Sequence, residues 1–187
     1  MGGYKIHDAK ISLKMKKTYS KLLVLLAVTG SLLGASCNKV DYPSGLPEYE
    51  NYYYAGFLPW DNKVIEVDRS QSEPIALPVQ FHSAYTRNYD AVAHYKLTTD
   101  GITDAAVVGV DFDIVDKAGQ PLQMQGDSVY TMTFPQAKAA YDTIYVKLLN
   151  NPAPGSRQIN IDLSLNETEQ YTVGIFSQAY RRPIKID

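Results

Sequence analysis

Apolar residues occupy every second position from Ile159 to Leu165, and Asn160, Asp162 and Ser164 fill the positions between them. Successive side chains of an extended strand point to opposite faces, so this spacing gathers the apolar side chains on one face. A helix would scatter them around its surface. The segment therefore predicts a strand with one face buried and the other in water.

The same period of two recurs past residue 47, and helical periodicity is almost absent. We expect further strands at 64–67, 75–81, 93–98, 112–115, 129–134, 144–149 and 183–186. Polar turn signals separate them, and 135–140 is expected to form one helical turn. Pro78 has no backbone N–H to donate, so we expect its strand at a sheet edge. Short strands without βαβ alternation predict an all-β fold, an antiparallel sandwich of two sheets.

The first 36 residues predict an export signal. Lysines precede an apolar run over 22–33, which is shorter than the ~20 residues needed to cross a bilayer. Met15 is the expected start of translation, because the residues before it lack signal character. We therefore expect 1–36 to be a signal peptide that is absent from the mature protein.

Cys37 is the only cysteine, and it follows directly on this signal. The sequence Gly34-Ala35-Ser36-Cys37 resembles the lipobox of bacterial lipoproteins, although glycine stands where leucine is usual. The resemblance implies a diacylglycerol on the Cys37 sulfur. It leaves 37–47 as a tether containing Pro and Gly, and 48–187 as a single β-sandwich domain. A plain secretory signal followed by a buried cysteine is the alternative.

The charge balance argues against nucleic acid as a partner. The chain has 18 basic and 20 acidic residues, of which six lysines and one aspartate lie in residues 1–36. Residues 37–187 therefore carry 12 basic against 19 acidic residues, a formal net charge of −7. This excess repels nucleic acid, and no basic stripe offsets it. Membrane attachment is accordingly expected from acyl chains alone.

Catalytic residues are scarce. Once Cys37 is acylated no thiol nucleophile remains, and His82 and His94 are the only near-neutral bases left. Neither has metal-ligand spacing, and His94 is expected on the wet face of a strand. Asp111 and Asp113 are expected side by side on one strand face, which suits solvent better than a glycosidase or calcium site. We expect no enzyme activity, no metal and no cofactor.

Residues 49–60 form the densest aromatic stretch of a chain with 15 tyrosines. Exposed rings give flat surfaces on which sugars stack, so Tyr53 and Trp60 are candidate ligand contacts. The alternative is a first strand whose tyrosines pack on the sheet, with Trp60 at one end of the sandwich. In such a strand Tyr52 and Tyr54 face one side and Tyr53 faces the other.

A polar loop provides a second group of candidate ligand contacts. Tyr85, Arg87 and Tyr89 place two rings and a guanidinium within five residues. Loops at the ends of a sandwich commonly carry binding residues. A tight turn with tyrosines at its edge is the alternative.

Four pieces of sequence occur in order in the second half of the chain: 99–112 with its Asp-Phe pair, 131–146, 159–174 and 183–186. Together they resemble a Calx-β domain, an immunoglobulin-like sandwich of extracellular and surface proteins. Calcium-binding members carry an acidic pair shortly before the long strand, and here that place reads Asn150-Asn151-Pro152-Ala153-Pro154-Gly155. The resemblance implies the immunoglobulin-like (Calx-β-like) sandwich, but this departure argues against a calcium site.

With its leader and tyrosine-rich start, the chain is similar to small Calx-β-like lipoproteins of Bacteroidota that accompany SusC/SusD-type uptake systems. The resemblance implies a lipid-anchored protein of the outer membrane, displayed at the cell surface. It implies a non-enzymatic role in nutrient capture, with a glycan as ligand and a SusC/SusD-type complex as partner. The alternative is a structural or interaction protein that docks onto such a complex through an edge strand and tyrosines, without a ligand of its own.

Overall fold

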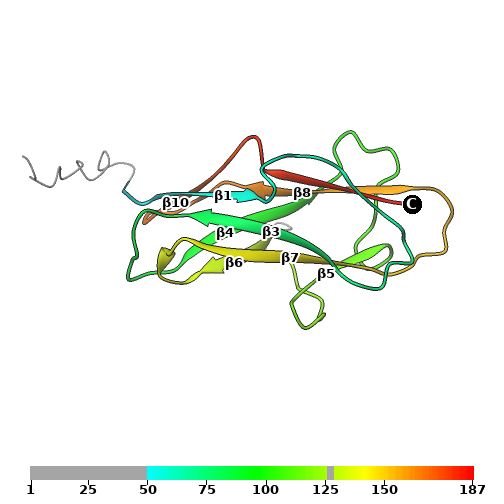
Figure 1. Ribbon diagram of the computed structural model, residues 1–187, viewed down its shortest axis with the longest axis horizontal. Helices are drawn as coiled ribbons and strands as arrows, with labels where there is room; N and C mark the ends of the chain where they lie inside the picture. Colours follow the sequence, from blue (N-terminus) through cyan, green and yellow to red (C-terminus); the bar gives the residue numbers. More distant parts are fainter. Residues whose placement is uncertain (1–49, 126–128) are drawn as a thin grey trace, which may run out of the picture. The chain divides into compact units, whose positions relative to one another are not determined.

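A computed structural model of the chain describes residues 50–125 and 129–187 (Figure 1). These residues belong to one unit, Leu46–Asp187, with its own hydrophobic core. The expected signal peptide over 1–36, the lipidated Cys37 and the tether over 37–47 lie outside the described residues.

The described strands form two sheets. The first sheet has the order β5-β7-β3-β1-β10-β9, with β5 at Phe112–Val115, β7 at Ala140–Leu148, β3 at Ile75–His82, β1 at Tyr52–Phe57, β10 at Thr172–Ile175 and β9 at Asn166–Glu167. The second sheet has the order β2-β11-β8-β4-β6, with β2 at Ile65–Val67, β11 at Arg181–Ile186, β8 at Arg157–Ser164, β4 at Ala91–Thr98 and β6 at Val129–Phe134. One turn of 3-10 helix, Pro135–Ala137, follows β6.

This arrangement confirms the all-β sandwich of two sheets. Every strand expected from the period of two is present. β1 is the first strand that was the alternative for the aromatic stretch 49–60, and β9 and β10 come in addition. Most neighbouring strands are antiparallel. Two pairs are parallel, β1 with β10 and β2 with β11, so each sheet joins a strand near the start of the domain to one near its end.

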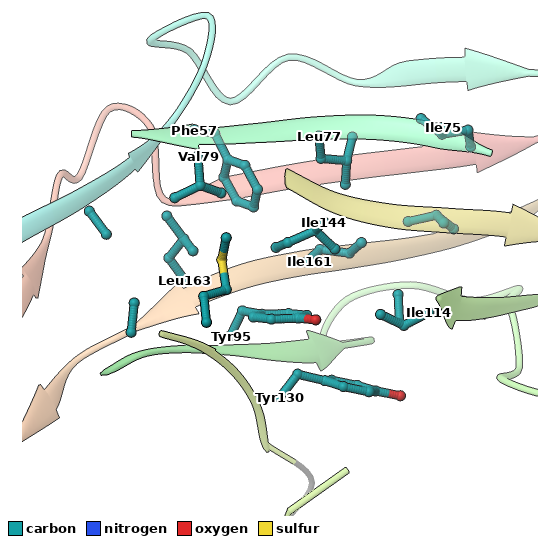
Figure 2. Close-up of a cluster of buried hydrophobic side chains, with 14 of the residues drawn as sticks. Phe57, Ile75, Leu77, Val79, Tyr95, Ile114, Tyr130, Ile144, Ile161 and Leu163 are labelled. Atoms are coloured by element: carbon teal, nitrogen blue, oxygen red, sulfur yellow. The ribbon is translucent and has the colours of Figure 1, made fainter. Parts of the chain in front are cut away.

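The core lies between the two sheets, and the alternating apolar residues of the strands fill it. Figure 2 shows Leu77 and Ile144 of the first sheet facing Ile161 and Leu163 of the second. All four side chains are buried. The apolar face that the sequence predicted for β8 is thus the face that packs against the other sheet.

The opposite face of β8 departs from the expectation of a wet surface. Asn160 and Asp162 are buried there. The Asp162 carboxylate accepts hydrogen bonds from the Arg181 guanidinium at 2.8 and 2.7 Å and from the Thr98 hydroxyl at 2.8 Å. Polar partners on the neighbouring strands therefore cover a face that alternation alone assigns to water.

The expectation of an edge position for the strand containing Pro78 is wrong. β3 lies inside the first sheet, between β7 and β1 (Figure 1). The Pro78 carbonyl accepts a hydrogen bond from the Leu58 N–H at 2.9 Å, so the Pro78 nitrogen also faces β1. β1 ends at Phe57, next to this point. The N–H group that Pro78 lacks would therefore point to where β1 has already ended. The hydrogen-bonded pairing of β3 with β7 is not interrupted.

Candidate functional site

The outer face of the first sheet carries a row of aromatic rings. Tyr52 and Tyr54 point outward from β1, with ring centroids 5.0 Å apart. Phe176, just after β10, stacks on Tyr54 at 4.9 Å, and the edge of Trp60 meets Phe176 at 4.7 Å. Tyr54 is 39% exposed and Trp60 is 41% exposed. We call these four rings the aromatic platform.

Two glycines let the rings lie directly on the sheet. A Cβ at Gly56 would stand 2.9 Å from the Trp60 ring, and a Cβ at Gly174 would stand 2.9 Å from the Tyr52 ring. Both distances are shorter than van der Waals contact. The absence of side chains at these positions on β1 and β10 therefore lets the Trp60 and Tyr52 rings approach the backbone of the sheet.

A trough of about 470 Å³ adjoins the platform. Tyr52 and Tyr54 of β1 line one side, and Tyr141 of β7, which is 68% exposed, lines the other. Gln80 and His82 lie between them, because β3 runs between β1 and β7. Among the described residues that line the trough there is no Asp, Glu, Lys or Arg.

The polar groups in the trough are hydroxyls, an amide and an imidazole. The Gln80 side-chain amide donates to the Tyr141 hydroxyl at 3.2 Å. The Nε2 atom of His82 is buried and has no hydrogen-bond partner within the described part of the chain. The His82 ring lies 5.2 Å from that of Trp60 and 5.6 Å from that of Phe176. The trough thus combines aromatic walls with groups that both donate and accept hydrogen bonds.

The structure separates the five candidate ligand contacts into two groups. Trp60 belongs to the platform, whereas Tyr53, Tyr85, Arg87 and Tyr89 gather around the loop after β3. Tyr53 is 2% exposed, because its position in β1 points into the sandwich while its neighbours point outward. Tyr53 is therefore a core residue, and we do not propose it as a ligand contact.

Arg87 and Tyr89 are engaged in holding the loop. The Tyr89 hydroxyl donates to Asn51 Oδ1 at 2.9 Å, so the Tyr53 hydroxyl is the donor in its 2.6 Å contact with Tyr89. Arg87 donates to the Glu50 carbonyl at 2.8 Å. Its guanidinium lies 5.1 Å from the centre of the Tyr85 ring, which is 48% exposed. Tyr85 is therefore the most open of the loop candidates.

The Tyr89 hydroxyl is expected to keep its proton in alkaline solution. Burial raises the pKa of Tyr89 to about 12. In the unfolded chain tyrosine ionises near pH ~10. The folded state thus holds a proton that the unfolded state loses, and stability falls as pH rises above about 10. Tyr89→Phe should weaken this fall, measured as the change in urea midpoint between pH 8 and pH 11. Equal changes in the variant and the parent would contradict the assignment.

The acidic residues near β5 support the fold. Asp111 precedes the strand, so it does not share a strand face with Asp113 as expected. It is buried, and its carboxylate accepts hydrogen bonds from the Val107 N–H at 2.8 Å and the Asn151 side chain at 2.7 Å. Within 50–125 and 129–187, no group of three or more His, Cys, Asp or Glu side chains is placed to hold a metal ion.

A guanidinium occupies the 150–155 loop. Arg69 donates to the carbonyls of Asn151 at 3.0 Å and of Gly155 at 2.7 Å, and also to that of Ala153. Its Nε donates to the Asp187 carbonyl at 3.1 Å. A side-chain cation therefore gathers the carbonyl oxygens of the 150–155 loop and ties this loop to the end of the chain.

His94 lies half-buried on β4, opposite Ser164 of β8 and Thr131 of β6. Burial, and then the charge of Lys96, lowers the pKa of His94. Its environment is that of a neutral side chain on a sheet surface.

No helix in the described segments is long and apolar enough to cross a bilayer.

Comparison with known proteins bears on the fold. No protein-family model matches the chain, and no curated protein matches it. Among solved structures, a two-domain protein of unknown function from Bacteroides fragilis has a TM-score of 0.51 at 6% identity, covering 73% of this chain and 46% of that protein. The likeness to that protein therefore concerns less than half of its length.

Two smaller domains are also similar. The apo form of the Calx CBD1 domain has a TM-score of 0.46 at 14% identity, covering 72% of this chain and 97% of the domain. A type III cohesin from the cell-surface anchoring scaffoldin ScaE of Ruminococcus flavefaciens has a TM-score of 0.41 at 6% identity, covering 76% and 93%. At such identities the likeness concerns the sandwich fold alone.

Proposed function

We propose that this protein is a non-enzymatic, lipid-anchored binding protein that captures a glycan at the cell surface. The observation that carries the proposal is the aromatic platform beside an uncharged trough on the outer face of the first sheet. Contiguous exposed apolar surface marks binding sites in soluble domains. Tyr54 and Trp60 are exposed, and exposed rings offer faces on which sugar rings stack.

The proposed location rests on the resemblance of 34–37 to a lipobox. Cys37 carries the lipid in this proposal, and residues 38–47 link it to the domain. A single lipidated cysteine places the sandwich at the outer membrane without a membrane-spanning helix. The SusC/SusD-type uptake complex is the proposed partner that receives the captured glycan.

Removing Trp60 is expected to weaken glycan binding about threefold to tenfold. An aromatic contact contributes ~0.5–1.5 kcal/mol beyond its buried area, and ~1.4 kcal/mol is a factor of ten in affinity. The chain from residue 38 onward contains the whole unit Leu46–Asp187 and can be run on native gels containing a panel of polysaccharides. We expect retardation of the parent chain and reduced retardation of Trp60→Ala.

Two further variants locate the site. Gly56→Ala adds a methyl group beneath the Trp60 ring, so it should tilt the ring and reduce retardation without removing any aromatic group. Val110→Ala removes an exposed apolar side chain outside the platform and should behave like the parent. Loss of retardation in Tyr85→Ala, with none in Trp60→Ala, would move the site to the loop after β3.

The second candidate function is docking without a ligand, and the observation that favours it is the edge strand β6. Among the described strands only β4 pairs with β6, and its sequence Val-Tyr-Thr-Met-Thr-Phe contains no charge or proline. Edge strands of this kind accept a further strand from a partner. Co-purification of an outer-membrane partner that is lost in Thr131→Lys, together with no retardation by any polysaccharide, would favour this role.

A further inference from the structure

We propose that the ligand of the platform is an uncharged glycan of several sugar units that lies across the strands, from Trp60 to Tyr141. This inference rests on the function proposed above and names the class of ligand that the same site takes. Three observations carry it: the spacing of the two exposed rings, the neutrality of the trough, and the unpartnered nitrogen of His82.

The sheet register sets the spacing of the rings. Gly56 of β1 pairs with Gln80 of β3, and Gln80 pairs in turn with Tyr141 of β7. Because neighbouring strands are ~4.8 Å apart, Gly56 and Tyr141 are separated by about 10 Å. The Trp60 ring rests on Gly56. The two exposed rings are therefore anchored at backbone positions on either side of Gln80 that are further apart than the width of one sugar ring.

This spacing requires an extended ligand. A single sugar that stacks on Trp60 does not reach Tyr141, whereas a chain of sugars contacts both rings and passes over Gln80. The Gln80 amide and the Tyr141 hydroxyl each donate and accept hydrogen bonds, as sugar hydroxyls do. The site therefore favours a chain with hydroxyl groups between two stacked units.

The charge of the site excludes acidic glycans. A carboxylate or sulfate group only accepts hydrogen bonds, and it is bound well where Arg or Lys provides charged donors. The described lining of the trough has neither. Residues 37–187 also carry the formal net charge of −7, which repels a polyanion as it approaches. An uncharged chain meets neither penalty.

His82 provides a further polar contact. Its buried Nε2 has no hydrogen-bond partner among the described residues, which is unfavourable for a polar atom. A hydroxyl group satisfies this atom in either tautomer of the ring, because a hydroxyl both donates and accepts. The Trp60 ring lies 5.2 Å from the His82 ring, so a sugar chain that contacts Trp60 passes close to this nitrogen.

The test compares chain length and charge on the same protein. Native gels containing xyloglucan, galactomannan or polygalacturonate measure retardation of the chain from residue 38 onward, and calorimetry measures binding of matched oligosaccharides of one to six units. We expect retardation by a neutral polysaccharide and none by polygalacturonate. Neutral oligosaccharides of three or more units should bind at least tenfold more tightly than the single sugar.

Variants separate the two rings. Tyr141→Ala should weaken binding of the longer oligosaccharides about threefold to tenfold and leave the weak binding of the single sugar unchanged, while Val110→Ala should change neither. Retardation by polygalacturonate equal to that by the neutral chains, or equal affinity for one unit and for six, would overturn this inference while leaving glycan capture intact. No retardation by any polysaccharide would instead overturn the proposed function itself.

Discussion

Arg182→Ala is expected to lower the free energy of unfolding by about 3–5 kcal/mol, the loss that follows when one partner of a buried ion pair is removed. Arg182 carries a charge but is only 2% exposed, because it lies on the core-facing side of β11. Its guanidinium donates to the carbonyls of Pro59 and Asp61 and to the Asp61 carboxylate at 3.0 Å. It also lies 5.3 Å from the centre of the Phe57 ring. Alanine would remove all of these contacts and leave the Pro59 carbonyl with only its hydrogen bond from the Asp61 N–H at 2.7 Å.

Urea unfolding of parent and variant measures this loss. Arg181→Ala is the matched control, because the Arg181 side chain is 30% exposed, against 3% for Arg182, and its partner Asp162 keeps the hydrogen bond from the Thr98 hydroxyl. We expect a smaller loss there, on the order of 1 kcal/mol. A loss below about 1 kcal/mol for Arg182→Ala would show that water replaces the guanidinium and that the turn after β1 does not depend on it.

Phe81→Ala is expected to cost about 3–5 kcal/mol, the usual range for a buried phenylalanine. Phe81 on β3 stacks on Phe134 on β6, with ring centroids 4.3 Å apart and planes 11° apart. The two strands belong to different sheets, so this pair joins the layers of the sandwich. Tyr53 also contacts Phe81, at 5.3 Å between ring centroids. Alanine would leave a cavity among rings that cannot close over it.

A double-mutant cycle with Phe134→Ala isolates the stacking. We expect a coupling of about 0.5–1.5 kcal/mol between the two positions, beyond the area that each ring buries. Urea midpoints of the four proteins provide it. Strictly additive losses would mean that the two rings act as independent fillers of the core and that the stacking itself adds nothing.

The strands were predictable because their apolar residues alternate, and that pattern depends only on which face is buried. The expected wet face of β8 shows the limit of this reasoning. Alternation distinguishes two faces, but it does not say whether side chains from neighbouring strands cover the second one. Arg181 and Thr98 come from β11 and β4, and the sequence of β8 alone does not indicate that they contact it.

Strand neighbours were not predictable. Pro78 was expected at an edge because a proline cannot complete a ladder on both sides. The ladder that it would interrupt ends at that point, since β1 stops at Phe57. A rule about one strand therefore fails when the adjacent strand is shorter. Arg182 escaped prediction for a related reason, because its partners come from the turn after β1.

The aromatic platform was predictable in part. The density of aromatic residues over 49–60 pointed to the segment that carries three of its rings, and alternation separated Tyr53 from Tyr52 and Tyr54. Phe176 and Tyr141 lie far away in the sequence and join these rings only through sheet order. Gly56 and Gly174 were the available signal: a glycine inside a strand often marks a place where another group approaches the backbone closely.

The parallel pairings of β1 with β10 and of β2 with β11 have a consequence for how the chain folds. Tyr52 pairs with Thr172 and Ile65 with Ile184, so both sheets need segments from opposite ends of the domain. Large loops must close before such contacts form, which slows folding toward the millisecond to second range. The first sheet is complete only after β10 has been synthesised, and the second only after β11. A nascent chain with this topology therefore finishes both sheets only when nearly the whole domain is available.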